Sequence, residues 1–305
     1  MSFLAIFKSA GPTGFGYGST AERVTEGLSL AGQTILVTGC NSGIGQEACR
    51  VLALRGALVL GTARTKEKAI AACASFPGKA IGYDCELSDP RSVRGCVSAV
   101  KADGHRLDAV ICNAGIMMLP KLEKSHGYEL QFFTNHIGHF MLVTGLLEQL
   151  KDKGRVVMLS SEGHRQAPAG GIEFDNLSGD KGYRPLTAYG QSKMANLLFA
   201  KELQRRFAGT GKTAYAVHPG VVATNLARNL GPVLRRVLSA IAPLFLKSVG
   251  EGAATEVFAA VNAKALPLTG SYLSDSNVEK PRADAEDASL AARLWAESEK
   301  IVQSL

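Results

Sequence analysis

The chain has 305 residues, 46% of them hydrophobic and 20% charged, which excludes a disordered protein and suits one large α/β domain or two small ones. Its net charge of +7 comes from dispersed lysines and arginines without a long basic run, so we expect no nucleic-acid partner. Six scattered cysteines lack a C-x-x-C pair and zinc-ligand spacing, which excludes a disulfide scaffold and predicts reduced, mostly buried thiols.

The N-terminal residues differ in composition from the rest of the chain. Residues 1–18 are rich in glycine and aromatic residues and predict a loosely packed lead-in. Ser19-Thr-Ala-Glu22 has the spacing of a capping box, which predicts the start of a short helix. We therefore expect an N-terminal extension over residues 1–31 and one domain over residues 32–305.

Apolar, β-rich runs alternate with helical stretches along the rest of the chain. Strands are predicted at Thr34–Thr38, Leu58–Thr62, Ala80–Tyr83, Ala109–Cys112, Arg155–Ser160, Ala214–His218 and Ser271–Leu273. Helices are predicted at Ile44–Leu54, Lys66–Ser75, Pro90–Lys101, Gly127–Leu150, Ala188–Phe207, Glu251–Ala260 and Asp287–Gln303. Continuous apolar strands separated by helices are typical of a parallel sheet buried on both faces. The pattern predicts a single-domain, Rossmann-type α/β fold with a doubly wound parallel sheet.

Two segments interrupt this alternation. Glu162–Thr187 contains several glycines and prolines, and Asn225–Lys247 is apolar with an arginine pair and two prolines. Both follow predicted strand ends, where open α/β sheets bind ligands. We interpret both as elements that cover a substrate, with a lid at about residues 225–247; the alternative is that they are surface loops.

A glycine-rich turn, Thr38–Gly45, follows the first predicted strand and precedes a helix. Glycines permit a tight turn and the close approach of a pyrophosphate, and the helix N-terminus offers free N–H groups to an anion. We interpret this turn as a dinucleotide site, although turns use glycine for other reasons as well.

The end of the second predicted strand indicates which dinucleotide is bound. NAD-binding folds place a carboxylate there to hold the ribose hydroxyls, whereas this chain has Ala63 and Arg64. Ala63 leaves room for a 2′-phosphate and Arg64 can pair with it. NADP(H) is therefore expected in preference to NAD(H); the alternative is that Arg64 is only a solvated loop residue.

Tyr189 and Lys193 are four residues apart and share one face of a predicted helix. A tyrosine with a pKa of about 10 needs roughly 4 kcal/mol to lower that pKa by about three units. One cation at about 4 Å supplies a similar energy at an effective dielectric constant near 20. The spacing therefore predicts an activated tyrosine, although Tyr-x-x-x-Lys alone is common by chance.

Further motifs accompany this pair in a fixed order. Cys-Asn-Ala-Gly115 follows the fourth predicted strand, Ser160-Ser161 the fifth, and Pro219-Gly220 the sixth. With the glycine turn, these motifs resemble the short-chain dehydrogenase/reductase family over about residues 32–275. Glu129-Leu-Gln, Thr134-Asn-His-Ile-Gly-His-Phe140 and Ser-Ser-Glu-Gly-His164 resemble its retinol-dehydrogenase-like branch. The Phe15-Gly-Tyr-Gly-Ser-Thr-Ala-Glu lead-in and Asp-Ser-Asn277 resemble plant and bacterial members, including a chloroplast-envelope dehydrogenase associated with protein import.

The resemblance implies four catalytic residues. Tyr189 would exchange a proton with the substrate oxygen, and Lys193 would lower the tyrosine pKa and hold the nicotinamide ribose. Ser161 would hydrogen-bond the substrate oxygen, and Asn135 would hold a helix bend and a water in a proton relay. The expected cofactor contacts are Gly39, Asn41, Ser42, Gly43, Ile44, Gly45, Arg64, Glu86, Leu87, Asn113, Ala114, Gly115, Tyr189, Lys193, Pro219, Gly220, Val222 and Thr224.

The chain departs from the family pattern at a few positions. Glu86 stands before Leu87 where the family usually has aspartate, so this contact near the adenine is expected to be longer or rearranged. Cys112 stands where asparagine is commoner, and the segment between Ser161 and Tyr189 is longer than usual, as in the retinol-dehydrogenase-like branch.

Histidines could suggest a metal site. His136, His139 and His164 lack a carboxylate or cysteine that would complete one, so we expect helix packing and caps instead, and no metal. His218, before Pro219 at a strand end, is expected to be structural.

We therefore expect an NADP(H)-dependent oxidoreductase that interconverts a lipophilic alcohol and its aldehyde or ketone. The alternative is an NADPH-binding sensor or scaffold with little turnover. The resemblance leaves two oligomeric states open: a homodimer that pairs through the helices predicted at Gly127–Leu150 and Ala188–Phe207, as is common in the family, or a monomer, as in some branches with lipophilic substrates. No apolar run reaches the roughly 18–20 residues of a membrane span, so a cytoplasmic location is expected, with peripheral contact through Phe3–Phe7 or Leu230–Leu246 as an alternative.

Overall fold

The computed structural model describes residues 9–222 and 246–305. At its centre lies an eight-stranded sheet with the order β10-β9-β8-β7-β4-β1-β2-β3. The strands are β1 Thr34–Thr38, β2 Leu58–Ala63, β3 Ala80–Asp84, β4 Leu107–Cys112, β7 Leu150–Leu159, β8 Thr213–His218, β9 Tyr272–Ser274 and β10 Asn277–Val278. The pairs are parallel except β9–β10, and the order reverses between β1 and β4, as in a doubly wound sheet.

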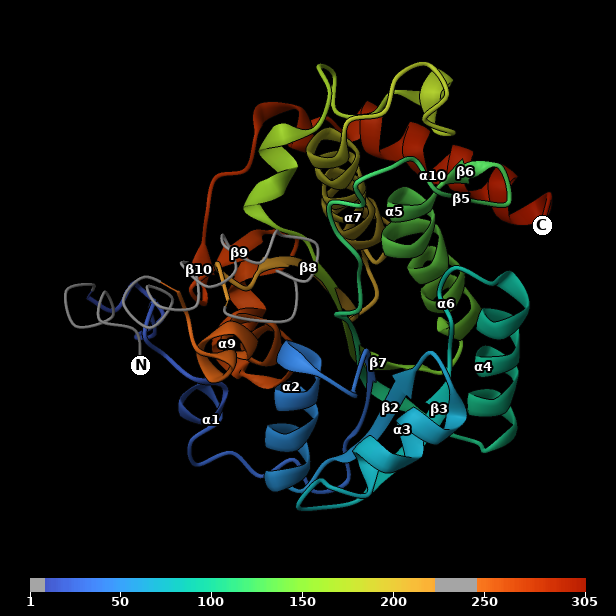
Figure 1. Ribbon diagram of the computed structural model, residues 1–305. Coiled ribbons are helices and arrows are strands. Elements are labelled where there is room, and N and C mark those ends of the chain that lie inside the picture. The colour runs from blue at the N-terminus through green and yellow to red at the C-terminus, as the bar shows by residue number, and fades with distance from the viewer. Residues whose placement is uncertain (1–8, 223–245) are drawn as a thin grey trace, which may run out of the picture.

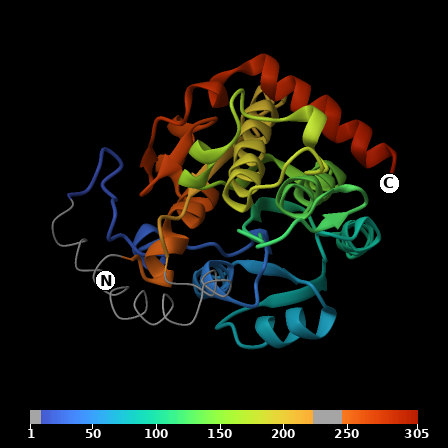
Figure 2. The same cartoon turned by 45° about the horizontal axis from the view of Figure 1, so that its top comes forward.

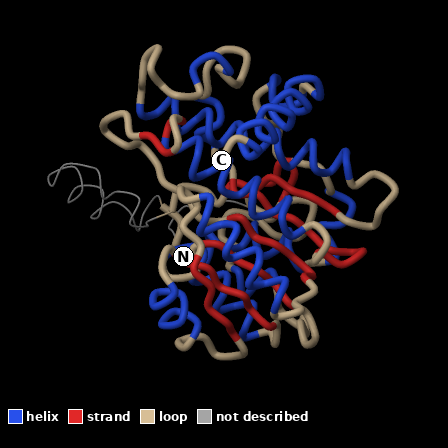
Figure 3. The backbone as a smooth tube through the Cα atoms, turned by 90° about the vertical axis from the view of Figure 1, so that its right-hand side faces the viewer, coloured by secondary structure: helices blue, strands red, loops and turns tan. Residues whose placement is uncertain are grey.

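Helices cover both faces of this sheet, as Figures 1 and 3 show. They are α1 Ala21–Val24, α2 Gly43–Leu54, α3 Lys66–Cys73, α4 Pro90–Ala102, α5 Leu130–Phe132, α6 Gly138–Leu146, α7 Pro185–Arg206, α9 Val249–Val261 and α10 Ala288–Gln303. Helices α1, α2, α3 and α9 enclose one hydrophobic core with the sheet, and α4, α6, α7 and α10 enclose the other. Because the strands are buried on both faces, they read as continuous apolar runs, and the predicted fold class is confirmed.

The helix predicted at Gly127–Leu150 is wrong at both ends. Gly127 has a φ of +85° and turns a small hairpin of β5 Lys124–Ser125 and β6 Tyr128–Glu129. The helical stretch begins at Leu130 and includes a π-helical turn at Phe133–Ile137. It ends at Leu146, because Leu150 already pairs with β4.

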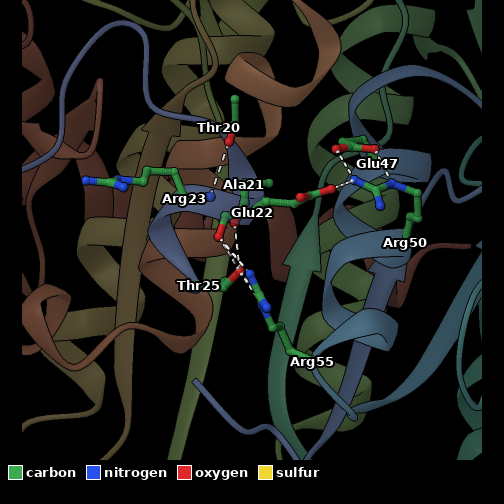
Figure 4. A network of polar contacts seen from close by, with 8 residues as sticks. All are labelled: Thr20, Ala21, Glu22, Arg23, Thr25, Glu47, Arg50 and Arg55. Carbon is green, nitrogen blue, oxygen red and sulfur yellow. Dashed lines mark hydrogen bonds and ion pairs between the residues drawn. The ribbon is translucent and has the colours of Figure 1, made fainter. Parts of the chain in front are cut away.

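The predicted capping box at Ser19 is displaced by one residue. Thr20 is the N-cap of α1 and accepts a hydrogen bond from the Arg23 amide at 3.2 Å. Glu22 bonds to Arg50 on α2 instead, and Arg50 also reaches Glu47 (Figure 4). Thr20 therefore caps the helix start locally, while Glu22 joins a tertiary ion pair in place of the expected capping contact.

Residues 9–18 are not a loose lead-in. The Thr13 amide and hydroxyl both donate to the Asn277 side chain at 3.1 Å, and Asn277 donates back to the Phe15 carbonyl at 2.9 Å. The Phe15 ring packs edge-on against Phe258 of α9, with 5.7 Å between ring centroids. The described part of the N-terminal extension therefore folds onto the main body.

The two irregular segments have different outcomes. Residues 162–184 form short 3-10 turns, η3 Glu162–Gln166 and η4 Phe174–Asn176, and loops that lead into α7, which begins at Pro185. The expected lid lies outside the described residues except for its last two positions, and so does the expected membrane-contact segment Phe3–Phe7. Within the described ranges, no helix is long and apolar enough to cross a membrane.

The C-terminal helix α10 packs against α7 (Figure 2). Its Trp295 ring contacts Phe140 of α6 at 5.0 Å and Phe199 of α7 at 5.5 Å between centroids. Arg206 stacks over the same indole at 3.9 Å. α10 thus covers part of the helix faces through which a homodimer would form.

Candidate active site

The predicted site residues follow the carboxyl ends of β1, β2, β3, β4, β7 and β8, or lie on the helices that come after them. Because these strands are parallel, all six ends meet at one edge of the sheet. Residues from distant parts of the sequence are brought together at this edge.

The glycine turn after β1 requires glycine at Gly39 and Gly45. Gly39 has a φ of +78°, and a Cβ on Gly45 would lie 2.3 Å from the Asn113 side-chain nitrogen and 2.5 Å from the Gly39 carbonyl oxygen. Asn113 holds the turn from β4 by donating to the Thr38 carbonyl at 2.8 Å. The motif residues of β1 and β4 therefore form one unit.

The N-terminus of α2 has the features of an anion site. Its N-cap Ser42 makes no side-chain hydrogen bond to the helix, so no side-chain cap occupies the first N–H groups. Asn41 and Ser42 are exposed, whereas Ile44 is buried beneath the turn, with 7% of its surface accessible. These residues fit the diphosphate of a dinucleotide.

Residues after β2 and β3 lie where the adenosine half of a dinucleotide would bind. β2 ends at Ala63, and Arg64 follows with an exposed side chain. After β3, the Glu86 carboxylate accepts hydrogen bonds from the amide and hydroxyl of Ser88, at 3.1 and 2.9 Å. Glu86 thus caps a local turn beside the buried Leu87, and its contact with an adenine stays an expectation.

Tyr189, in the first part of α7, lies against the end of β7. Its ring approaches Gly163 so closely that a Cβ there would lie 2.7 Å from the ring and 3.3 Å from the Ser161 hydroxyl. The nearby Ser161 side chain lowers the pKa of the Tyr189 phenol, but burial raises this pKa by more. The Ser161 oxygen also accepts from the Gly163 amide at 3.0 Å.

Lys193 is a buried cation, 4% exposed, whose ammonium donates to the Leu159 carbonyl at 2.9 Å. Burial lowers its pKa to about 8, a shift that the nearby Glu256 opposes. The ammonium lies 5.8 Å from the centroid of the Tyr189 ring. In the free protein burial is therefore the larger influence on the Tyr189 pKa, and the lowering of that pKa by Lys193 stays an expectation.

Asn135 lies in the π-helical turn, as the expectation of a helix bend requires. Its side chain bonds to both the amide and the carbonyl of Ile116 at 2.9 Å, and donates to Ser192 at 2.9 Å. A Cβ on Gly115 would lie 3.0 Å from the Asn135 oxygen and 3.5 Å from the Lys193 ammonium. Gly115 therefore marks the point where Asn135 and Lys193 approach each other.

Sequence reasoning missed the contacts that three polar side chains make at this site, those of His139, Thr38 and Ser160. The His139 ring donates from Nδ1 to the Asn135 carbonyl at 2.9 Å and accepts from the Thr38 hydroxyl at 2.9 Å. Burial lowers the His139 pKa to about 4, so the ring is neutral. Ser160 donates to the Lys193 carbonyl at 2.8 Å. The i, i+4 spacing of Asn135 and His139 was a signal for the first of these contacts.

The stretch after β8 lies beside the glycine turn. A Cβ on Gly252 of α9 would meet Val222 at 2.6 Å and Ile44 at 3.3 Å, so these two side chains converge there. Pro219 and Gly220 precede them at the end of β8. Thr224 lies outside the described residues.

The histidines have structural partners. His136 bonds to Ser298 at 2.8 Å, His164 to the Ser161 carbonyl at 2.7 Å, and His218 accepts from the Glu162 amide at 3.3 Å. Among the described residues, no group of three or more metal-binding side chains occurs.

Known proteins share this arrangement of motifs. A sequence profile of the family described as short chain dehydrogenase matches residues 33–233. The chain is 39% identical over 312 residues to short-chain dehydrogenase TIC 32 A, chloroplastic, of Brassica napus, and the alignment covers 97% of each protein. This chain belongs to the short-chain dehydrogenase family.

Two further relatives show where this chain stands within the family. Retinol dehydrogenase 12 of Mus musculus is 40% identical over 280 residues, covering 89% of this chain and 86% of its own length. A short chain dehydrogenase from Burkholderia cenocepacia, solved in complex with NADP, superposes with a TM-score of 0.65 at 25% identity, over 80% of this chain and 96% of its own. The chain is an oxidoreductase-family member of the retinol-dehydrogenase-like branch, with a fold that binds nicotinamide cofactors.

Proposed function

We propose that this dehydrogenase interconverts an alcohol and its aldehyde or ketone with NADP(H) as cofactor, and that Tyr189 is its acid/base. The observation that carries the proposal is that the Tyr189 ring and the Ser161 hydroxyl both converge on Gly163 beside the buried Lys193, at the edge of the sheet where the glycine turn lies. A phenol, a hydroxyl and a cation at one point are the groups that stabilise a developing alkoxide.

The cofactor, when bound, supplies or accepts the hydride. During carbonyl reduction Tyr189 donates its hydroxyl proton to the carbonyl oxygen of the substrate. Because burial raises the Tyr189 pKa, the free protein holds this proton at neutral pH. The Ser161 oxygen accepts from the Gly163 amide, so its own proton is available to the same substrate oxygen.

Lys193 and Asn135 support the proton donor. The Lys193 ammonium remains buried near the phenol and stabilises the tyrosinate left after proton transfer. Asn135 holds the backbone at Ile116 and the Ser192 hydroxyl, which lies one residue before the lysine. These contacts fix the lysine and tyrosine on the same side of α7.

Arg64 supports a preference for NADP(H). β2 ends at Ala63, and the exposed Arg64 follows it. Neither residue carries a carboxylate that could hold a ribose hydroxyl. The relative from Burkholderia cenocepacia that was solved with NADP agrees with this assignment. We expect the 2′-phosphate to pair with Arg64 as a charge-assisted hydrogen bond.

The proposed substrate is lipophilic. Support comes from the apolar sequence of residues 233–246 and from the likeness to retinol dehydrogenase 12. A panel of apolar aldehydes and ketones, matched with carboxylated and phosphorylated analogues, tests this point with NADPH consumption as the signal. Preference for the charged analogues would refute the lipophilic assignment, and NADPH binding without any turnover would favour the sensor or scaffold instead.

A further inference from the structure

Lys247 is a buried lysine to which the proposed reaction assigns no role. Its side chain is 1% exposed and forms an ion pair with Asp275 in the turn between β9 and β10. Its ammonium lies 4.9 Å from the centroid of the Tyr17 ring. A buried cation is costly unless it is paired, and here a carboxylate and an aromatic face supply the partners.

The stem of Lys247 passes directly beneath the turn that ends β8. Gly220 has a φ of +85°, which favours glycine, and a Cβ there would lie 2.6 Å from Cδ and 2.9 Å from Cε of Lys247, so the stem passes very close to the turn. The Lys247 amide donates to the Val221 carbonyl at 2.9 Å, and Lys247 forms a parallel β-bridge with Val222. The lysine therefore contacts the turn Pro219–Val222 with both its backbone and its side chain.

The two partners of Lys247 are themselves held firmly. Asp275 has a φ of +51°, and its carbonyl accepts from the Asn277 side chain at 2.8 Å. The same Asn277 amide donates to the Phe15 carbonyl, two residues before Tyr17. One asparagine thus links the strand turn that carries Asp275 to the N-terminal segment that carries Tyr17.

We propose that Lys247 is a positioning residue that fixes the turn Pro219–Val222 for the cofactor. With Asp275 and Tyr17 it forms an anchor that joins the N-terminal extension, the end of β8 and the β9–β10 turn. The inference rests on the proposed function, because it assigns that turn to nicotinamide-cofactor binding. It follows that the N-terminal extension, outside residues 33–233 that the family profile matches, contributes to cofactor affinity.

The test compares wild type with Lys247→Met, which keeps the stem and removes the charge, and with Tyr17→Leu, which removes the aromatic cover. Titration with NADPH, followed by protein fluorescence, gives the Kd. We expect Lys247→Met to raise the Kd for NADPH about tenfold, which lies within the range of coupling free energies found between two sites of a protein. Tyr17→Leu should raise the Kd by a smaller factor. At saturating NADPH, kcat should change less than about twofold, because the anchor touches no reacting atom.

Two controls separate positioning from general stability. Lys201→Met removes another ion pair of the structure, with Glu286 at 2.6 Å, and should leave the Kd unchanged. Lys247→Arg keeps the charge and should raise the Kd less than Lys247→Met does, because a cation that can pair with Asp275 is retained. A fall in melting temperature with an unchanged Kd for Lys247→Met would overturn the inference.

Hydrogen exchange tests, in the absence of cofactor, whether Lys247 holds the turn Pro219–Val222. In the free protein, Lys247→Met should speed the exchange of amides 220–222 relative to wild type, while amides of β1 keep their rates. Unchanged exchange at 220–222 would refute the anchor. If wild type binds no NADPH, the proposed function fails, whereas wild-type binding with an equal Kd for Lys247→Met refutes only the inference.

Discussion

The cofactor preference can be tested by replacing Arg64 with alanine. Arg64 is exposed at the end of β2, and its neighbour Ala63 offers no carboxylate. A hydrogen bond to a charged group is worth about 1.5–3 kcal/mol, and solvent screening of an exposed pair places this one near the lower limit. At about 1.4 kcal/mol per decade, the variant should bind NADPH about tenfold more weakly.

Binding of NADH should not change in Arg64→Ala, because NADH lacks the 2′-phosphate. The assay measures Kd values for both cofactors in wild type, Arg64→Ala and Arg23→Ala, a control that removes an exposed arginine of α1. Higher salt should narrow the wild-type preference, since it screens the exposed pair. An equal NADPH-to-NADH ratio in wild type and Arg64→Ala would show that Arg64 does not bind the phosphate.

Three further predictions concern pH and assembly. Because burial lowers the Lys193 pKa to about 8, kcat/KM for carbonyl reduction should fall as the pH rises through about 8; a profile that stays flat well above this value would contradict the role of the cation. Burial also lowers the His136 pKa to about 3, so between this value and the ordinary value of about 6.5 the unfolded state binds more protons. Stability is therefore fully present above about pH 6.5 and is lost as the pH falls, by up to about 1.4 kcal/mol per unit for this group; a thermal unfolding midpoint that does not fall toward pH 5 would refute this. Because Trp295 of α10 covers both Phe140 and Phe199, light scattering should show a monomer, and a dimer formed through α6 and α7 would require α10 to move.

Much of the fold follows from local sequence. The strands and most helices have clear apolar patterns, and the glycine turn occupies the position after β1 that its motif indicates. The hairpin at residues 124–129 was missed because its two-residue strands are too short for a periodic signal. The helix after it also contains a π-helical turn, which leaves no mark on the hydrophobic pattern.

Other features depend on contacts between distant residues. Thr13 and Asn277 are 264 positions apart, so the docking of the N-terminal segment has no local signature. The same holds for the pKa of Tyr189, because burial by the surrounding chain raises it and the i, i+4 spacing to Lys193 gives no sign of that burial. Spacing placed both residues on α7, but the ammonium bonds to a carbonyl of β7.

The central claim is that Tyr189 is the acid/base of an NADPH-dependent reaction. The most direct test follows nicotinamide absorbance with wild type, Tyr189→Phe and the matched control Tyr215→Phe, whose hydroxyl bonds to the Ala265 carbonyl away from the site. We expect Tyr189→Phe to bind NADPH normally but to reduce apolar carbonyls at least about 100-fold more slowly, the usual contribution of a general acid. Turnover by Tyr189→Phe at the wild-type rate would contradict the account.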